Sequence, residues 1–161
     1  MGTSLQSSSC AIIVTYNPDI TALLELVGQL SKETDFIIVD NGTAGISSIV
    51  ESINVYKQCM EIIRLNKNEG LAKALNVGIH WSVRHKYKFV FLFDQDSSLC
   101  DLFVKRMIKA YGDARGKTEA SIAAVGPRII NPQTMRQTSF KLFNRFIFRS
   151  NVRLAESTSH Y

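Results

Sequence analysis

Two carboxylates separated by one residue are the clearest chemical signal in this sequence. Asp94 and Asp96 flank Gln95, and they come directly after a hydrophobic run that ends at Phe93. Such a pair is costly at the end of a buried strand unless a cation or solvent compensates its charge. Mg²⁺ is usually held by one or two carboxylates, with phosphates and water completing its coordination. The pair therefore favours a cation that bridges to a diphosphate, and the alternative is a pair of solvated loop carboxylates.

The elements that must position this pair alternate between short apolar strands and longer amphipathic helices. Strands are expected at residues 10–14, 36–39, 62–65, 88–93 and 122–125. Helices are expected at residues 18–31, around the apolar stripe of residues 46–53, at residues 71–84 and at residues 101–114. The first helix is expected to have Asn17 as its N-cap and Pro18 as its first helical residue.

This alternation predicts an α/β fold with a mostly parallel sheet, right-handed crossovers and helices on both faces. In such an open sheet, ligands bind beyond the carboxyl ends of the strands. The polar turns fall at those ends, at residues 15–17, 40–42, 66–70 and 94–96. We therefore expect four turns that are distant in the sequence to converge on one edge of the sheet.

The composition is that of an ordinary globular chain. Of 161 residues, 45% are hydrophobic and 20% are charged, which excludes a disordered, collagenous or coiled-coil chain. No apolar run approaches the ~20 residues of a membrane-spanning helix. Three cysteines without metal-like spacing favour a reducing compartment. Residues 1–9 have neither a basic start nor an apolar stretch, so we expect a flexible lead and no signal peptide.

The net charge of +5 is concentrated in one segment. Six of the 19 basic residues and none of the 14 acidic residues lie between residues 128 and 153, so the remainder of the chain is close to neutral. A nucleic-acid partner, which requires positive charge spread over a face of the fold, is therefore not expected.

Several enzyme classes are excluded by missing motifs. The sequence has no Walker-type loop, no Gly-x-Gly-x-x-Gly after the first strand and no Gly-x-Ser-x-Gly. His80 and His85 have no Cys or carboxylate at ligand spacing, so we expect surface or packing roles for them. The cysteines are expected to be small hydrophobic residues without a catalytic role.

Four ordered motifs lie at residues 11–18, 37–42, 68–79 and 93–97. Together they resemble the motifs of family 2 glycosyltransferases. Within that family, the Phe-Asp-Gln-Asp-Ser form is most similar to bacterial rhamnosyltransferases that build surface polysaccharides. The resemblance covers residues 10–131 and implies a GT-A fold with a nucleotide-sugar site.

The resemblance also implies a role for each matching position. Thr15 and Tyr16 would contact the base and ribose through backbone groups, and Asp40 would accept a hydrogen bond from the pyrimidine ring. Asp94 would lie near the ribose, and Asp96 would hold Mg²⁺ or Mn²⁺ against the two phosphates. The wall beside the nucleotide would be formed by Asn68, Gly70 and Ala74. Taken singly, several of these residues are equally well explained as turn or cap residues.

The implied reaction is an inverting, metal-assisted transfer of a sugar from a nucleoside-diphosphate donor to a lipid-linked or surface-polysaccharide acceptor. The expected enzyme is a rhamnosyltransferase, with dTDP-rhamnose as its donor. Inversion by direct displacement also requires a base that deprotonates the acceptor hydroxyl. No residue of the sequence is identified as that base. The resemblance therefore leaves open an alternative, a catalytically incomplete fragment that binds nucleotide-sugar without transfer.

The expected organisation is a flexible lead at residues 1–9, a nucleotide-sugar-binding GT-A half at residues 10–131, and the start of a truncated acceptor half or a tail at residues 132–161. Residues 140–149 mix aromatic and basic side chains, as an amphipathic surface helix at an anionic leaflet does. The same aromatics would equally pack under a second half. The expected location is cytoplasmic, with peripheral contact at the inner face of the plasma membrane.

A third interpretation is a phospho-acceptor signalling domain, since such α/β domains also carry acidic pairs at strand ends. That interpretation requires an acidic pair after the first strand and a lysine after the fifth. Thr15 and Tyr16 occupy the first of those places, and Gly126 and Pro127 occupy the second.

Overall fold

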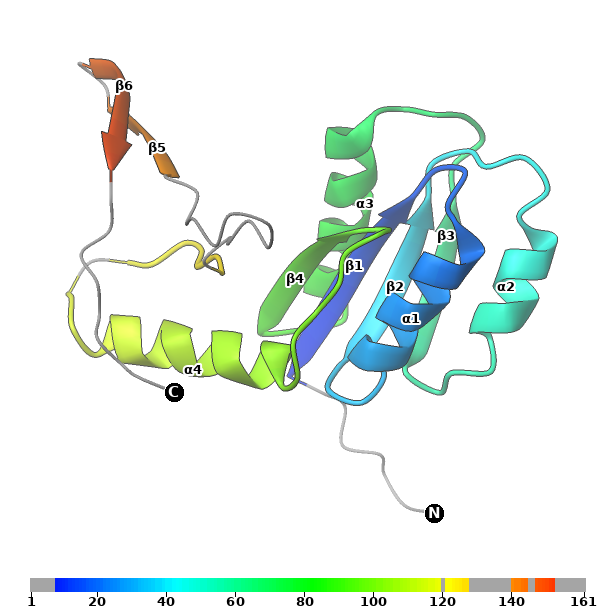
Figure 1. Cartoon of the computed structure of the whole chain (residues 1–161), viewed down its shortest axis with the longest axis horizontal. Helices are drawn as coiled ribbons and strands as arrows, with labels where there is room; N and C mark the ends of the chain where they lie inside the picture. The colour runs from blue at the N-terminus through cyan, green and yellow to red at the C-terminus, as the bar shows by residue number, and fades with distance from the viewer. Residues whose placement is uncertain (1–7, 120, 128–139, 145–146, 153–161) are drawn as a thin grey trace. The chain divides into compact units, whose positions relative to one another are not determined.

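The computed structural model describes residues 8–119, 121–127, 140–144 and 147–152. The chain divides into two compact units, Met1–Ser121 and Ile122–Tyr161, which are described separately. Figure 1 shows the elements of both units along the chain.

The first unit is built on a four-stranded sheet in the order β3-β2-β1-β4, and every neighbouring pair of strands is parallel. This confirms the expected α/β fold and four of the five expected strands. The carboxyl ends of all four strands consequently lie at one edge of the sheet. The strands are β1 (Ser9–Thr15), β2 (Asp35–Asp40), β3 (Cys59–Arg64) and β4 (Phe89–Asp94).

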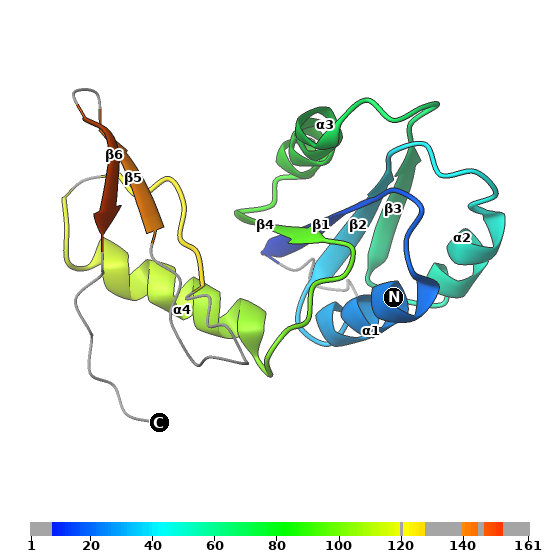
Figure 2. The ribbon, with the colours of Figure 1, turned by 45° about the horizontal axis from the view of Figure 1, so that its top comes forward.

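Helices cover both faces of this sheet, as expected, and Figure 2 shows α3 on one side with α1 and α2 on the other. Alternation along the strands divides the apolar residues between the two faces. Ile13 and Phe36 pack with α1 and α4 residues, whereas Ile12 and Ile37 pack with α3 residues. The helices are α1 (Ile20–Leu30), α2 (Ser47–Ile53), α3 (Leu71–Arg84) and α4 (Phe103–Arg115).

Small residues let α3 approach the sheet closely. The side of the helix that faces the sheet carries Ala74, Gly78 and Ser82, each four residues after the last, and all three are buried. A Cβ atom added at Gly78 would lie 2.5 Å from Cγ2 of Ile12, which is itself fully buried. Ile12 is β-branched and stiff, so it has little freedom to move aside. Gly78 therefore sets the distance between α3 and β1.

The start of α1 differs from the expectation. Its N-cap is Asp19, whose Oδ1 accepts hydrogen bonds from Thr21 N at 2.8 Å and Ala22 N at 3.0 Å. Asn17 adopts a positive φ of 45° and belongs to the preceding turn. The prediction of Asn17 as the cap is wrong because Asp19 is an equally good capping residue and lies two positions closer to the apolar stripe.

The second unit contains a two-stranded antiparallel sheet of β5 (Phe140–Asn144) and β6 (Ile147–Val152). Of the two interpretations of residues 140–149, the amphipathic surface helix is therefore wrong for residues 140–144 and 147–149. Aromatic and β-branched residues favour strands, and a short segment rich in them fits either period. The strand expected at residues 122–125 is also wrong, because residues 121–127 form no regular element. Two central alanines give that segment a low strand propensity.

Within the described part of the chain, no helix is long and apolar enough to cross a membrane.

A glycine-to-alanine pair tests the close approach of α3. Alanine normally stabilises a helix interior by about 1 kcal/mol relative to glycine. We expect this gain for Gly112→Ala, because a Cβ there meets nothing within 4 Å. We expect Gly78→Ala to destabilise the protein instead, by about 1–3 kcal/mol, because the added carbon overpacks against Ile12. Urea unfolding of both variants measures the difference, and a stabilised Gly78→Ala would contradict the packing described.

Candidate functional site

The turns at the four carboxyl ends are joined to one another by hydrogen bonds. We call these turns, residues 15–17, 40–43, 66–70 and 94–97, the carboxyl edge. Side chains link the turn after β1 to the turns after β2 and β4, and other side chains link the turn after β2 to the turn after β3. The links follow the strand order of the sheet. The expected convergence of the four turns is thus confirmed.

Asp40 lies at the centre of this arrangement and is only 2% exposed. Its Oδ1 accepts a hydrogen bond from the Thr15 hydroxyl at 3.1 Å, and its Oδ2 accepts from Gly42 N at 3.3 Å and Thr43 N at 3.0 Å. A buried carboxylate is very costly unless such donors satisfy it. A carboxylate offers about four acceptor positions, and these three donors from the protein fill three of them.

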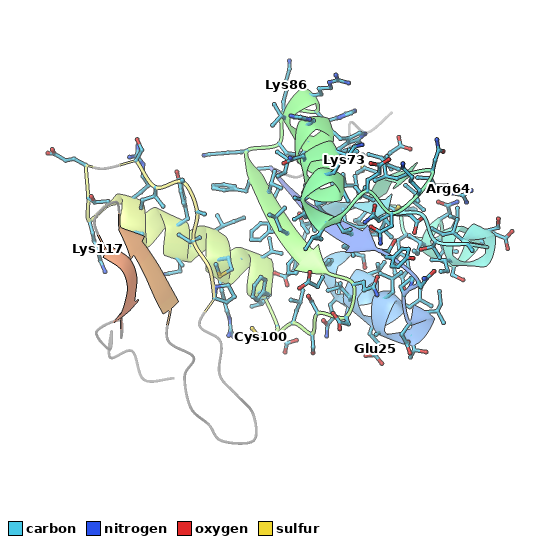
Figure 3. The ribbon with its side chains drawn as sticks, turned by 90° about the horizontal axis from the view of Figure 1, so that it is seen from above. Glu25, Arg64, Lys73, Lys86, Cys100 and Lys117 are labelled. Atoms are coloured by element: carbon cyan, nitrogen blue, oxygen red, sulfur yellow. The ribbon has the colours of Figure 1, made fainter. Side chains whose placement is uncertain are left out.

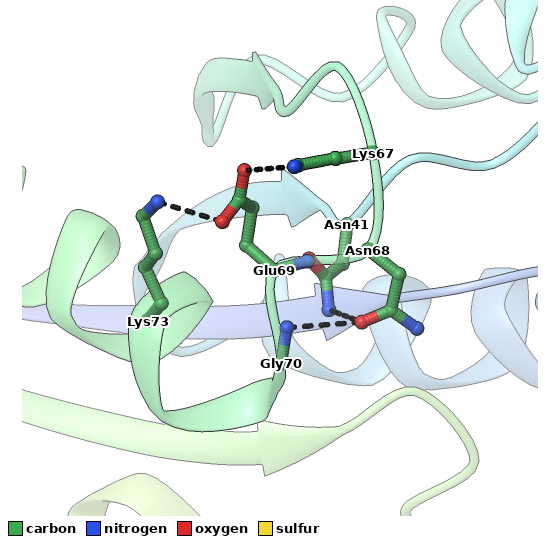
Figure 4. Close-up of polar contacts among 6 residues, drawn as sticks. All are labelled: Asn41, Lys67, Asn68, Glu69, Gly70 and Lys73. Carbon is green, nitrogen blue, oxygen red and sulfur yellow. Dashed lines mark hydrogen bonds and ion pairs between the residues drawn. The ribbon is translucent and has the colours of Figure 1, made fainter.

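The turns after β2 and β3 are joined by two asparagine side chains, as Figure 4 shows. The buried Asn41 donates from Nδ2 to Asn68 Oδ1 at 3.0 Å and accepts from Glu69 N at 2.9 Å. Asn68 Oδ1 also accepts from Gly70 N at 2.9 Å, which fixes the turn where α3 begins. Lys73 reaches Glu69 at 2.7 Å, an exposed ion pair of the kind that contributes about 0–1 kcal/mol. The amides, more than the charges, hold these turns together.

Gly42 allows the two turns to touch. Its φ is +92°, a conformation that other residues avoid. A Cβ there would lie 2.6 Å from the carbonyl carbon of Lys67 and 2.8 Å from Asn68 N, and both are backbone atoms that cannot rotate away. Only glycine therefore fits both the conformation and the space at this position.

Gln95 joins the turn after β4 to the turn after β1. Its Oε1 accepts from Tyr16 N at 2.8 Å, and its Nε2 donates to Tyr16 O at 3.4 Å. Asn17 N in turn donates to Thr43 Oγ1 at 3.0 Å. The backbone groups of Tyr16 are thus engaged by Gln95, although the residue as a whole is 46% exposed.

Asp94 and Asp96 are both exposed, and they flank a turn in which Ser97 N donates to Asp94 O at 3.1 Å. Asp94 pairs in register with Val14, and Asp40 pairs with Thr15 of the same central strand. The two aspartates are therefore separated by two strand spacings, about 10 Å between backbones. Alternation directs Asp94 to the α3 face and Asp40 to the opposite face.

The donor set at this edge fits a cation whose coordination the substrate completes. Among the described residues, no three His, Cys, Asp or Glu side chains are grouped as a metal cage. Both oxygens of Asp40 are engaged, which leaves the exposed carboxylates of Asp94 and Asp96. Mg²⁺ is commonly held in this way, by one or two carboxylates together with substrate phosphates and water.

The two remaining predicted residues lie at the beginning of α3. Gly70 is the N-cap residue and has a φ of +87°. Ala74 is fully buried, one turn into the helix, and packs with Ile12 and Ile37. Their expected role as a wall beside a nucleotide stays a prediction.

Two residues of the carboxyl edge were not predicted from the sequence. The sequence pattern indicates only a turn residue at Asn41 and a spacer between two aspartates at Gln95. A weak signal existed for each, because an amide can donate and accept at once and thus suits a position between two backbones. Only the strand order shows which backbones those are.

Cys10, Cys59 and His85 have the packing roles expected for them, whereas Cys100 does not. Burial raises the pKa of Cys10 and of Cys59 to about 11, so both thiols stay protonated at neutral pH. Cys100 is exposed, on the segment between β4 and α4 (Figure 3). His85 stacks on Trp81 with ring centroids 3.8 Å apart.

A groove of about 380 Å³ lies at the other end of the sheet, where the strands begin. It is remote from the carboxyl edge, and it has two lysines at an apolar wall. The groove is lined by Ser8, Ser9, Lys32, Glu33, Leu102, Val104, Lys105 and Ile108.

Comparison with known proteins identifies the family. The sequence model of Glycosyl transferase family 2 matches residues 10–158, most of the chain and all four turns of the carboxyl edge. The chain belongs to Glycosyl transferase family 2. Membership favours a transferase over the signalling domain that shares acidic strand ends.

Individual relatives of this family 2 member cover only parts of it. It is 31% identical over 103 residues to dTDP-rhamnosyl transferase RfbF of Shigella flexneri, a match over 64% of this chain and 34% of RfbF. The chain thus spans about a third of that relative. The crystal structure of S. aureus TarS superposes with a TM-score of 0.51 at 24% identity, over 67% of this chain and 20% of TarS, and supports the GT-A-like fold.

A further solved structure resembles the chain more weakly. It is the mannosyltransferase PcManGT from Pyrobaculum calidifontis in complex with GDP-Man and Mn²⁺. Its TM-score is 0.44 at 18% identity, over 58% of this chain and 28% of PcManGT. A likeness at this level carries no argument about the site.

The hydroxyl of Thr15 is the first group to test. Thr15→Val keeps the shape of the side chain but removes the donor to the buried Asp40 carboxylate, at an expected cost of about 2 kcal/mol in unfolding free energy. Thr15→Ser keeps the hydroxyl and loses one methyl group, worth about 0.8 kcal/mol. Chemical denaturation compares the two, and a valine variant as stable as the serine variant would argue against the bond.

The close contact between Gly42 and the backbone of Lys67 can be tested by alanine substitution. Gly45, which also has a positive φ, serves as the control. Gly45→Ala incurs only left-handed strain, about 1–2 kcal/mol, because a Cβ there meets nothing within 4 Å. Gly42→Ala adds a clash with the backbone of Lys67, so we expect its melting temperature to fall clearly further. Equal losses in the two variants would contradict the close approach of the two turns.

Proposed function

We propose that the protein transfers a sugar from a nucleoside-diphosphate donor to a surface-polysaccharide or lipid-linked acceptor, with a divalent cation at the carboxyl edge. The donor proposed is dTDP-rhamnose. Family membership supports the reaction class, and the similarity to RfbF supports the donor. The observation that carries the proposal is the hydrogen-bonded edge, which joins a buried aspartate to an exposed acidic pair across three strands.

The nucleoside end of the proposed site is the turn after β1 together with Asp40. The remaining acceptor position of the Asp40 carboxylate suits an N–H of a pyrimidine ring. Tyr16 directly follows Thr15, the residue that donates to Asp40, and the ring of this exposed residue would offer an apolar face to the base. The hydrogen bonds that fix Asp40 hold this end in shape before any ligand arrives.

The diphosphate end of the proposed site is the acidic turn. Asp96, with Asp94 beside it, would hold Mg²⁺ or Mn²⁺ against the two phosphates. When bound, such a cation stabilises the negative charge that develops on a departing nucleoside diphosphate. The exposure of both carboxylates leaves room for phosphate oxygens to complete the coordination.

The acceptor end of the reaction needs a base that removes the proton of the attacking hydroxyl. We propose direct displacement with inversion at the anomeric carbon, as the family resemblance implies. The described residues of the carboxyl edge offer no further uncommitted carboxylate or histidine for this step. A second candidate function is therefore donor binding without transfer by these 161 residues.

The test is a metal-dependent assay of the whole chain with dTDP-rhamnose. We expect release of dTDP, by hydrolysis or transfer, that stops on chelation and returns with Mn²⁺. Asp96→Ala should lower this rate by about a hundredfold, the usual effect of removing one well-placed electrostatic partner.

Asp101→Ala serves as the matched control, because it removes another exposed aspartate of the same connecting segment. We expect it to retain the wild-type rate. Metal-dependent dTDP binding without any turnover would favour the second candidate. An unchanged rate in Asp96→Ala would contradict the proposed metal site.

A further inference from the structure

Gln95 is the one residue of the acidic turn whose side chain is committed to another strand end. Its amide meets both backbone groups of Tyr16, at 2.8 Å from the N–H and 3.4 Å from the carbonyl oxygen. Among neutral side chains, only Asn and Gln carry such an amide, and glutamine has the longer reach. The fit of donor to acceptor on both sides indicates a specific bridge between the turns after β4 and β1.

The position of this bridge lets it restrain the conformation of the turn that carries Asp94 and Asp96. Gln95 lies between Asp94 and Asp96, in the turn closed by Ser97 N and Asp94 O at 3.1 Å. The two carboxylates repel each other, and both are exposed, so neither fixes the conformation of the turn. The Gln95 amide supplies a restraint that the aspartates cannot supply for themselves.

We propose that Gln95 is a positioning residue that holds the acidic turn in register with the turn after β1, so that cation binding and nucleotide binding reinforce each other. The inference rests on the proposed function, since it assigns the nucleoside to one turn and the cation to the other. Gln95 acts without touching either ligand.

Removing the bridge should weaken the cooperation, while two other hydrogen bonds still hold the nucleoside end. That end keeps the bond between Thr15 and Asp40, and Asn17 N keeps its bond to Thr43. The loss should therefore appear in the ratio of dTDP affinities with and without Mn²⁺. Residues that orient the ligands of a metal typically change affinity by about 10–100-fold when mutated, so we expect this ratio to fall by about tenfold.

The experiment is calorimetric titration of the full chain with dTDP, with and without Mn²⁺, for wild type, Gln95→Leu and Gln95→Asn. Leucine removes the amide, and asparagine keeps it but is one methylene too short to span both groups. Gln29→Leu is the matched control, because Gln29 also accepts a hydrogen bond from the segment after β4, from Leu99 N at 3.2 Å. We expect the control to keep the wild-type ratio.

The possible outcomes distinguish failure of the positioning role of Gln95 from failure of the proposed function. A tenfold lower ratio in both Gln95 variants, with metal-free affinity and melting temperature like those of the control, supports the positioning role. A wild-type ratio in either folded variant, or the same fall in Gln29→Leu, overturns it and leaves the proposed function intact. A wild-type protein that binds no dTDP under either condition overturns the proposed function and this inference together.

Discussion

A carboxylate buried at the end of a central strand constrains the whole carboxyl edge. Asp40 is almost inaccessible, so its oxygens must find donors within the protein. They find them in the Thr15 hydroxyl and in the backbone of residues 42–43. To supply those donors, the chain after β2 must turn back over the strand end at Gly42. This turn places Gly42 directly against the backbone of Lys67. Only glycine fits there, because a Cβ atom would clash with that backbone.

The remaining links extend the same constraint across the sheet. Asn41 carries it to the turn after β3, and Gln95 carries it to the turn after β4. The side chains of Asp40, Asn41 and Gln95 thus perform one task, because each lies where two parallel strands end side by side. Below them, the close packing of α3 at Gly78 fixes the sheet on which these ends lie. An edge shaped in this way is formed before a ligand binds, which lowers the cost of ordering it.

Periodicity and turn chemistry predicted the first unit well, since strongly apolar runs and polar turns carry local signals. The strands from Ser9 to Asp94, their parallel orientation and the convergence of their ends follow from such signals. The sequence was less informative where two local structures fit it equally well, as with two possible cap residues or with a helix and a strand. Asp19 replaces Asn17 as a helix cap, and residues 140–144 and 147–152 form strands in place of an amphipathic helix. The roles of Asn41 and Gln95 depend on which strands are neighbours, and no local pattern encodes that.

The central claim is that the carboxyl edge binds a nucleoside diphosphate together with a divalent cation. Backbone amide resonances of the full chain, followed during titration with dTDP and then with Mn²⁺, test it most directly. The account predicts that dTDP shifts the amides of residues 15–17 and 40–43, and that paramagnetic Mn²⁺ then broadens those of residues 94–97 first. Shifts and broadening centred on the groove near Lys32 and Lys105, at the opposite end of the sheet, would contradict it.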